Sequence, residues 1–521
     1  MNASISRLAT VLVVVASLGT ASVASGAPRF LSRNLFAPQE IQQVSVSPSG
    51  DWVAALASKN EMYGVIVQRY GRRETLPIYT SPEYIYEIQW VGERTLFVRH
   101  STAEGLRVKA MAFRLAESKG KITADSLEIT ARGNLVDPLP DEDEIVLWGH
   151  NHRKGSMVRK GPISAVSPSS HWKLSGIKDG GKMKVITKLR RQTHLFIADR
   201  NGLPRASLSW SGRRRPERVV MYRASADDQW REIWRAEDDE DVLRPQGFTA
   251  DGERLLVLAY GDHDTLGLHE FDTEKKKLGR TVLALDHADI NSVIFDYTGK
   301  EIVAVSYLEG GQVKHHYLND FSAQNLAEFV GHQPGETVRI TSSSRDYRFF
   351  SIIVYGARNP GTFYFFDKQT GRRTKLGELI PGIPSDQLIE IQTIDIVAPD
   401  GTKLEGFLAL PETSDGKPPP LLVMPHGGPI AVQDSQYFDP LVQYLALDGI
   451  AVLKVNYRGS AGYGKLFKDA GKQQWAGLIE DDINAGVNEV IARGLVDPDR
   501  LCIAGESYGG FSALVSSYRY P

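Results

Sequence analysis

The 521-residue sequence contains a single cysteine, Cys502, and this scarcity excludes several classes of protein. One cysteine can form neither an intramolecular disulfide nor a multi-cysteine metal site, so a disulfide scaffold, a zinc ribbon and an iron–sulfur carrier are excluded. The sequence also lacks a charge imbalance, because 61 Lys and Arg residues are balanced by 63 Asp and Glu residues. A net charge of −2 gives no general attraction to nucleic acid or to an anionic membrane, so we expect neither as a partner.

Hydrophobic runs of membrane-spanning length are missing as well. The apolar run near the N-terminus extends from Leu8 to Leu18, well short of the ~20 residues that a spanning helix needs. It follows Arg7 and precedes small residues around Ala24, which is the pattern of a secretory signal peptide rather than an uncleaved anchor. We expect residues 1–24 to be a signal peptide and the mature protein to be exported, either periplasmic or extracellular, with no membrane attachment after cleavage.

Helical periodicity is almost absent from residues 28–385, where short β-rich runs alternate with turn residues. A polar turn followed by an alternating apolar strand recurs at equal intervals: Gly252 and Gly299 are 47 residues apart, and Asp346 follows after another 47. Such a period, built from several short strands, is typical of a β-propeller with one blade per repeat. The length of the segment predicts seven or eight blades. A long β-sandwich is the alternative, but it would not explain the equal spacing.

From residue 386 to residue 521 the pattern changes to apolar strands alternating with helical segments, which indicates an α/β sheet. Helices are expected at Ser435–Leu447 and at about Gly477–Arg493. The expected strands are Ile389–Val397, Leu404–Leu410, Leu421–Met424, Ile450–Val455 and Arg500–Ala504.

The strongest chemical signal is residues 505–510 (GESYGG), which directly follow the last expected strand and precede a helical pattern. This is the G-x-S-x-G nucleophile elbow of α/β-hydrolases in its required context. The serine must occupy a sharp, strained turn, and Gly505 and Gly509 let the neighbouring backbone pass without Cβ clashes. We predict that Ser507 is a nucleophile, and that the start of the following helix directs amides at an oxyanion formed there.

A second motif, residues 426–429 (HGGP), follows the expected strand Leu421–Met424. The α/β-hydrolase architecture takes one oxyanion-hole amide from the residue after the nucleophile and another from an earlier glycine-rich loop. Here these donors are expected to be the backbone N–H of Tyr508 and that of Gly427 or Gly428. His426 could instead be imagined as the general base, but we expect its imidazole to hold the loop by packing or hydrogen bonding.

A third motif, residues 456–464 (NYRGSAGYG), leaves the expected strand Ile450–Val455, and no phosphate-binding Lys-[Ser/Thr] ending follows it. In this order behind a propeller, the three motifs resemble the prolyl oligopeptidase family of serine peptidases (family S9), and most closely its acylaminoacyl-peptidase-like branch. The motifs cover about residues 386–521. The resemblance implies Ser507 as nucleophile, the Tyr508 and Gly427 or Gly428 amides as oxyanion donors, and peptides as substrates. It also implies a propeller that covers the active site and restricts access, and no need for a cofactor or a metal.

The sequence departs from the family pattern after the elbow. In this fold the catalytic triad runs Ser, then Asp or Glu, then His, yet no Asp, Glu or His follows Ser507, and the last of the twelve histidines is His426. We therefore expect a C-terminally truncated chain whose α/β part is the N-terminal half of a hydrolase domain, inactive as it stands. Two alternatives are an esterase on the same fold and a propeller binding module with a remnant hydrolase half.

We assign no binding site to the other polar clusters in the sequence. Asp262-His263-Asp264 has metal-ligand residue types, but no second cluster completes a site. The acidic run Glu237–Asp241 and the basic runs Arg213–Arg215 and Lys275–Lys277 are expected to be solvated loops, and Cys502 is expected in the core.

Overall fold

The computed structural model describes residues 34–101, 108–119, 121–129, 134–137, 144–151, 155–162, 184–189, 193–211, 217–237, 242–320, 324, 335–413 and 416–520. The chain divides into two compact units. Among the described residues, the propeller unit lies within Ala37–Glu309 and Val313–Gly382, and the α/β unit lies within residues 383–520 together with residues 34–36 and Gly310–Gln312. The expected signal peptide, residues 1–24, and the basic run Arg213–Arg215 lie outside the described residues.

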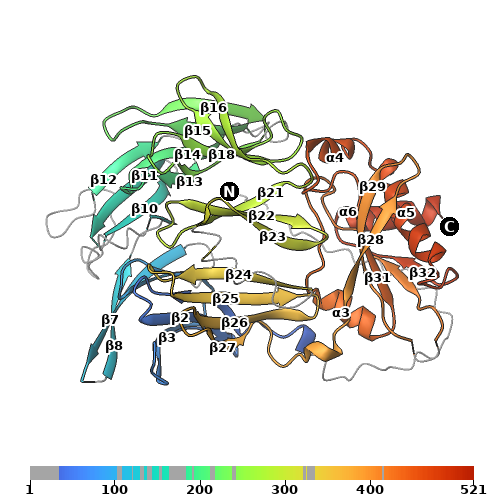
Figure 1. Cartoon of the computed structure of the whole chain (residues 1–521), viewed down its shortest axis with the longest axis horizontal. Helices are drawn as coiled ribbons and strands as arrows, with labels where there is room; N and C mark the ends of the chain where they lie inside the picture. The colour runs from blue at the N-terminus through green and yellow to red at the C-terminus, as the bar shows by residue number, and fades with distance from the viewer. Residues whose placement is uncertain are drawn as a thin grey trace, which may run out of the picture. The chain divides into compact units, whose positions relative to one another are not determined.

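The propeller unit is built of antiparallel sheets whose strands follow one another along the chain (Figure 1). Within the described ranges there are seven such sheets, so of the seven or eight blades that the repeat predicts the structure has seven. The first three blades are β1 (Ile41–Val46), β2 (Trp52–Lys59), β3 (Met62–Arg69) and β4 (Thr75–Ser81); β5 (Ile85–Trp90), β6 (Thr95–Ser101), β7 (Val108–Ser118) and β8 (Lys121–Ile129); and β9 (Asn134–Asp137), β10 (Glu144–Asn151), β11 (Gly155–Pro162) and β12 (Lys184–Leu189). The next two are β13 (Thr193–Ala198), β14 (Pro204–Ser211), β15 (Glu217–Tyr222) and β16 (Arg231–Glu237); and β17 (Leu243–Phe248), β18 (Leu255–Ala259), β19 (Gly267–Asp272) and β20 (Lys277–Leu283). The last two are β21 (Ile290–Phe295), β22 (Ile302–Glu309) and β23 (Gln312–Tyr317); and β24 (Glu336–Ser343), β25 (Phe349–Gly356), β26 (Asn359–Asp367) and β27 (Arg372–Glu378).

The turn between the first and second strands has the same hydrogen bonds in four of the described blades. Its first residue is Ser47, Thr249, Asp296 or Ser344; the amide of this residue donates to the carbonyl five positions on, and its carbonyl accepts from the amide three positions on. The side-chain oxygen of this residue accepts the amide five positions on, at 2.9–3.1 Å. Ser, Thr and Asp are the residues that bind nearby amides in this way. The motif that recurs in the sequence is therefore this turn.

The fourth residue of the turn adopts a positive φ, which explains why glycine recurs there. Gly252 and Gly299 have φ of 73° and 71°, and Tyr347 takes the same position in the last blade with φ of 52°. The structural repeat is thus 47 residues from Gly252 to Gly299 and 48 residues from Gly299 to Tyr347. The predicted equivalence of Asp346 with these glycines was wrong by one residue.

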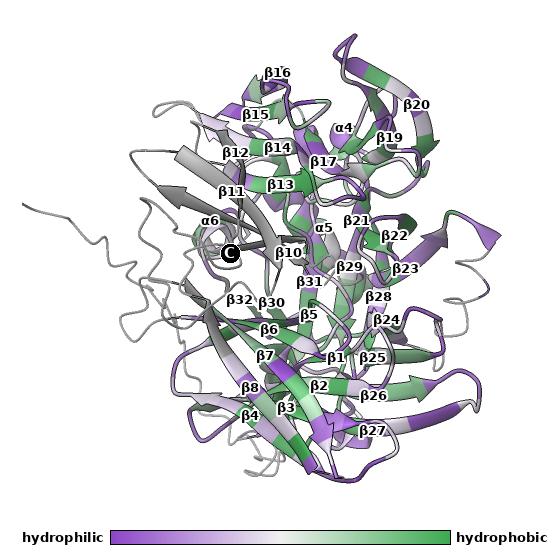
Figure 2. Cartoon of the chain, turned by 90° about the vertical axis from the view of Figure 1, so that its left-hand side faces the viewer, coloured by the Kyte–Doolittle hydropathy of each residue, from purple (hydrophilic) through white to green (hydrophobic). Residues whose placement is uncertain are grey.

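Hydrophobic side chains hold neighbouring blades together. Separate buried clusters join the first blade to the second, the fourth to the fifth, the fifth to the sixth, the sixth to the seventh, and the seventh back to the first. The strands inside a blade are apolar and the outermost strand is polar, as Figure 2 shows for β25 and β27. Each large apolar side chain buried between blades contributes about 1.5–3 kcal/mol, so the ring is held mainly by these clusters.

The ring closes between the first and last blades without any exchanged strand, because β1–β4 and β24–β27 form separate sheets. Polar contacts cross this seam: the amide of Val46 donates to Ser342 Oγ at 2.6 Å, and Thr341 Oγ1 donates to the carbonyl of Val44 at 3.0 Å. Asp367 at the end of β26 adds to them, since it accepts from Tyr70 of the first blade at 2.9 Å and from Arg348 at 3.2 Å.

In the α/β unit, one five-stranded sheet has the order β28-β29-β31-β30-β32. The strands β28 and β29 form an antiparallel hairpin and β29 is antiparallel to β31, whereas β31, β30 and β32 are parallel. The carboxyl ends of these three parallel strands meet at one edge of the sheet, and each is followed by one of the three sequence motifs. The strands are β28 (Ile391–Val397), β29 (Lys403–Ala409), β30 (Leu421–Val423), β31 (Ala451–Asn456) and β32 (Leu501–Ile503).

Helices follow the parallel strands: α3 (Pro440–Leu447) and α4 (Lys465–Ala470), then α5 (Leu478–Ala492) and α6 (Tyr508–Arg519). The helix α3 begins five residues later than expected, because Asp439 caps it through the amides of Leu441 and Val442 and Pro440 occupies its first position. The short helix α4 was not expected, since it starts directly after the glycine-rich motif. The helix α5 buries Ile479 and Ile483 against the sheet, as the i, i+4 spacing predicts.

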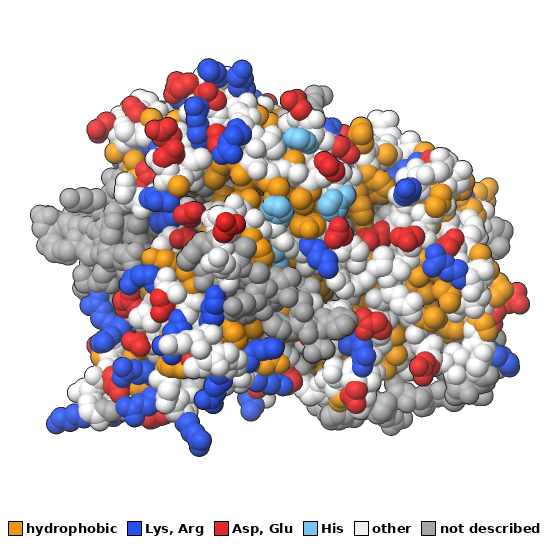
Figure 3. All heavy atoms as spheres, viewed as in Figure 1, with side chains coloured by type: hydrophobic (Ala, Val, Ile, Leu, Met, Phe, Trp, Pro, Cys, Tyr) orange, Lys and Arg blue, Asp and Glu red, His pale blue; other side chains and the backbone are white. Residues whose placement is uncertain are grey.

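Cys502 is exposed, so its expected place in the core was wrong; it lies on β32, the strand at the edge of the sheet. Acidic and basic side chains are interspersed over the face in Figure 3, in line with the balanced composition. None of the helices in the described ranges is both long enough and apolar enough to span a membrane.

Because Asp367 joins the first and last blades, the stability of the propeller unit depends on pH in the acid range. Burial opposes ionisation of this carboxyl, but hydrogen bonds from Arg348, Tyr70 and Thr370 outweigh burial and lower its pKa to about 2. Because the folded pKa lies below the ordinary value of 3.8, this stabilisation is present above pH 4 and is lost as the pH falls toward 2. We expect Asp367→Asn to lower the free energy of unfolding at pH 7 by about 1.5–3 kcal/mol, measured by urea unfolding followed by circular dichroism.

The matched control is Asp51→Asn, at an exposed position of the first blade. This control should unfold like the parent chain at every pH. The difference between the parent and Asp367→Asn should shrink between pH 4 and pH 2. Equal stability of the two proteins at pH 7 would exclude a stabilising role for this contact.

Candidate functional site

Ser507 lies where the chain turns sharply from β32 into α6. Its backbone has φ of 56° and ψ of −117°, a conformation that side-chain-bearing residues rarely adopt, and its side chain is exposed. The next residue, Tyr508, is the first residue of α6. The predicted elbow therefore has the strand–turn–helix geometry, with an exposed hydroxyl at the start of a helix whose first amides have no partner within it.

Glycines at 505 and 509 let the elbow form, because the backbone passes very close to itself there. A Cβ placed on Gly505 would lie 2.6 Å from the carbonyl carbon of Gly509, and one on Gly509 would overlap the carbonyl oxygen of Pro425. Pro425 belongs to the loop that leaves β30, so the same close approach brings the second motif against the elbow. Side chains at these two positions would force the two loops apart.

Of the two expected donors in the second motif, Gly427 is the one beside Ser507. A Cβ built on Gly427 would lie 3.4 Å from Ser507 Cβ and 3.9 Å from Ser507 Oγ. Around Gly428, which has φ of 123°, the nearest atoms belong to Ile430 and Val432 of its own loop. The missing side chain of Gly427 thus leaves open the space next to Ser507 Oγ.

His426 is held by the third motif. Its ring stacks on Tyr457 with centroids 4.3 Å apart, and its Nδ1 lies 2.9 Å from the Tyr457 hydroxyl. Its Nε2 lies 3.0 Å from Ser460 Oγ, which itself donates to the carbonyl of Tyr457 at 2.7 Å. Burial lowers the pKa of His426, so the ring is neutral at pH 7. Both ring nitrogens are therefore engaged in tying the second motif to the third.

A buried ion pair fixes the third motif to α5. Arg458 donates to both carboxylate oxygens of Asp482, at 2.6 and 2.8 Å, and its backbone amide donates to the same group at 2.9 Å. A further guanidinium N–H donates to Asp400 at 2.8 Å. These hydrogen bonds raise the pKa of Arg458 above its ordinary value. A bidentate, fully hydrogen-bonded pair of this kind fixes geometry, and here it fixes the loop that holds His426.

Tyr508 is anchored by a buried carboxylate that the sequence did not indicate. Its hydroxyl donates to Glu480 of α5 at 3.0 Å, and Ser512 and Ser516 of α6 donate to the same carboxylate at 2.6 and 3.2 Å. Glu480 is fully buried. Acidic residues are ordinary in the first turn of a helix, so the pattern of α5 carried no signal for this contact. Three hydroxyls of α6 converge on one group and fix the rotation of the helix that begins at the elbow.

Aromatic rings surround Tyr508 on its other sides. The centroids of Trp475, Phe511 and Tyr457 lie 5.5, 5.5 and 5.9 Å from its own. Burial and the charge of Glu480 raise the pKa of the Tyr508 hydroxyl, so it acts as a donor at neutral pH. The ring is thus fixed by packing and its tip by a hydrogen bond, which together set the position of its backbone N–H.

The arrangement supplies a candidate nucleophile and candidate oxyanion donors, but no base among the described residues is in contact with Ser507. Among the residues that the structure describes, no histidine or carboxylate hydrogen-bonds to Ser507 Oγ. No group of three or more His, Cys, Asp or Glu side chains within the described ranges is placed to hold a metal ion. Asp262-His263-Asp264 lies in an exposed turn between β18 and β19.

The close approach at the elbow predicts that one methyl group added at Gly509 strongly destabilises the α/β unit. We expect Gly509→Ala to lower the free energy of unfolding of the α/β unit by about 2–4 kcal/mol, because its Cβ overlaps the Pro425 carbonyl and rigid backbone must move. Urea unfolding followed by tryptophan fluorescence measures this. The control is Gly64→Ala, where the nearest atom to the new Cβ is 3.9 Å away and little change is expected. A stable Gly509→Ala variant would show that the elbow relaxes easily.

The buried carboxylate gives a second prediction, on α5 itself. Glu480→Ala leaves the hydroxyls of Tyr508, Ser512 and Ser516 without their acceptor, and we expect it to lower the free energy of unfolding by about 2–4 kcal/mol. Glu489→Ala on the same helix removes only a surface ion pair with Arg493, so the expected change is below about 0.5 kcal/mol. Similar unfolding midpoints for the two variants would contradict the anchoring role of Glu480.

The sequence of this chain is similar to sequences of known peptidases. Residues 436–520 match the model of the prolyl oligopeptidase family. Dipeptidyl aminopeptidase BIII of Pseudoxanthomonas mexicana is 31% identical over 350 residues, which are 64% of this chain and 49% of that protein. Dipeptidyl peptidase family member 6 of Caenorhabditis elegans is 25% identical over 329 residues, 58% of this chain and 44% of that protein. The chain thus spans about half the length of these curated relatives.

Solved structures match the fold of both units. A crystal structure of puromycin hydrolase aligns with a TM-score of 0.64 at 17% identity and covers 96% of this chain and 78% of that one. Pyrococcus horikoshii acylaminoacyl peptidase aligns with a TM-score of 0.60 at 12% identity and covers 93% of this chain and 76% of that one. These structures share the fold of a propeller with an α/β-hydrolase sheet. The sequence matches show that the chain is similar to the prolyl oligopeptidase family, peptidase family S9, and the solved structures show that it shares their fold.

Proposed function

We propose that this chain carries the nucleophilic half of a serine peptidase that hydrolyses short peptides through an acyl-enzyme on Ser507. The observation that carries the proposal is the exposed Ser507 at a strained elbow, with the side-chain-free Gly427 next to its hydroxyl. Ser507 Oγ would attack the scissile carbonyl and form a new C–O bond. The C–N bond then breaks, the amine leaves with a proton, and water releases the acyl group.

The oxyanion formed in this reaction would be bound by two backbone amides. One is the N–H of Tyr508, which Glu480 and the surrounding rings hold in place. The other is the N–H of Gly427, in the loop that His426 ties to Tyr457 and Ser460. Donors of this kind typically contribute about 10²–10³ in kcat each. Preorganisation of both loops by buried groups favours this role over that of a plain structural turn.

The proton acceptor is the part of the reaction for which the described residues place no group in contact with Ser507. Both ring nitrogens of His426 are hydrogen-bonded to residues of the third motif, and no Asp, Glu or His follows Ser507 in the sequence. A triad serine without its base loses roughly 10⁶-fold in kcat. We propose that the 521-residue chain alone is inactive, and that activity needs an Asp and a His supplied in addition to it.

Peptide substrates are proposed from the relatives, whose names describe dipeptidyl aminopeptidase and dipeptidyl peptidase proteins. Shorter matches reach acylamino-acid-releasing enzymes, for example 33% identity over 112 residues with enzyme 1 of Oryza sativa subsp. japonica. We further propose that the propeller limits access to small peptides. The signal-peptide pattern of residues 1–24 supports export before the protein acts.

A fluorophosphonate probe tests the nucleophile and the missing base together. We expect the 521-residue chain to be labelled slowly or not at all. Added imidazole should accelerate labelling by acting as a diffusible base, and Ser507→Ala should remove the accelerated signal. Mass spectrometry of the labelled peptide identifies the residue.

Each outcome of this experiment decides one part of the proposal. Rapid stoichiometric labelling of Ser507 without imidazole would show that a group already present acts as base. Failure of labelling in imidazole, while an active serine hydrolase is labelled in parallel, would count against Ser507 as nucleophile. Faster turnover of an ester than of the matching peptide by an activated protein would favour the esterase alternative.

A further inference from the structure

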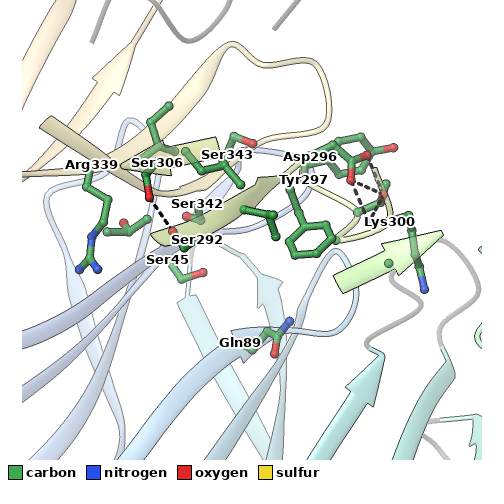
Figure 4. A pocket seen from close by; sticks show the side chains of 18 of the residues that line it. Ser45, Gln89, Ser292, Asp296, Tyr297, Lys300, Ser306, Arg339, Ser342 and Ser343 are labelled. Atoms are coloured by element: carbon green, nitrogen blue, oxygen red, sulfur yellow. Dashed lines mark hydrogen bonds between the residues drawn. The ribbon is translucent and has the colours of Figure 1, made fainter. Parts of the chain in front are cut away.

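The propeller unit contains a partly open cavity of about 1060 Å³. Cavities that hold small ligands have volumes of about 300–1,000 Å³, so this one has room for a short peptide. Its wall is formed mainly by the first strands of six blades, β1, β5, β13, β17, β21 and β24, with additional residues from β22, β23, β25 and the Asp296 turn. Figure 4 shows part of this wall.

Much of the wall is polar but uncharged, which suits hydrogen bonding to peptide groups. Hydroxyls and amides are contributed by several strands, for example Ser45, Gln89, Ser292, Ser306 and Ser343. Ser292 and Ser306 hydrogen-bond to each other at 2.6 Å. Only one hydroxyl of such a pair donates to the other, so the second keeps an O–H that can donate to a ligand.

The acidic side chains of the wall are already engaged. Glu87 forms an ion pair with Arg99 at 2.6 Å. Asp296 accepts from the amides of Lys300 and Glu301 and from Thr298 in its own turn. Both carboxylates therefore already have partners within the protein.

Arg339 of β24 also lines the cavity, but it differs from these two carboxylates in its contacts. It is exposed to the cavity, and among the described residues its guanidinium has no ion pair or hydrogen bond. In Figure 4 it extends to the opposite side from Asp296 and Lys300. A guanidinium presents a rigid fork of N–H groups that matches the two oxygens of a carboxylate.

We propose that this cavity binds short peptides by a carboxylate, with Arg339 as the anchor and the surrounding hydroxyls and amides bound to the peptide groups. The ligand is therefore a peptide with a free C-terminal carboxylate or an acidic side chain near its end. This inference rests on the proposed peptidase function for the choice of a peptide as ligand. It adds a carboxylate-selecting site within the propeller unit to that function.

Direct binding tests this without any turnover, in the 521-residue chain carrying Ser507→Ala. The probes for isothermal titration calorimetry at low salt are N-acetyl-tetraalanine, its C-terminal amide, and the same amide with glutamate as its last residue. We expect the acid to bind at least about tenfold more tightly than the plain amide, because a hydrogen-bonded charge pair is lost in the amide. Arg339→Gln should remove this difference.

The matched control is Arg73→Gln, at an exposed arginine outside the cavity, and it should keep the preference for the acid. Tight binding of the glutamate amide would assign recognition to any terminal carboxylate, and weak binding would restrict it to the C-terminal group. Equal affinity for acid and amide, or full affinity in Arg339→Gln, would overturn the proposal. So would acetate alone binding as tightly as the peptide. None of these results alters the labelling test of Ser507, so the two proposals fail separately.

Discussion

The geometry of the site depends on one close approach, that of Gly509 to the carbonyl of Pro425. It joins the end of β30 to the first turn of α6 and leaves no room for a single methyl group. Because β30 and β32 are adjacent parallel strands, this approach sets Ser507 and Gly427 side by side. The remaining polar contacts of the site keep these two loops from moving apart.

Those contacts connect buried charged groups to the two loops of the site. Asp482 and Arg458 fix the third motif, Tyr457 and Ser460 of that motif fix His426, and His426 precedes Gly427. On the other side, Glu480 fixes α6 through three hydroxyls. A buried carboxylate is costly unless it is fully hydrogen-bonded, and these carboxylates are hydrogen-bonded to the groups whose positions they fix.

The sequence alone predicted the features that depend on local pattern. The elbow, the glycine-rich loops and the propeller repeat are short motifs with a direct backbone cause, as the repeated turn at Ser47, Thr249 and Asp296 shows. Contacts between residues distant in sequence were not predictable. In the sequence, Glu480 looks like an ordinary acidic residue in the first turn of a helix, and Asp367 looks like an ordinary turn residue. The helix α4 is too short to show a helical periodicity of apolar residues. The exposure of Cys502 follows from strand order, which no local pattern encodes.

The position of β32 at the edge of its sheet has a geometric consequence. Its outer side presents backbone donors and acceptors, and a strand that paired with them would lie about 4.8 Å from β32. A polypeptide that paired with it in parallel would end at the same edge as β30, β31 and β32. The residue that followed such a strand would then lie at the same edge as Ser507, so the register of an added strand would determine which side chain reaches that edge.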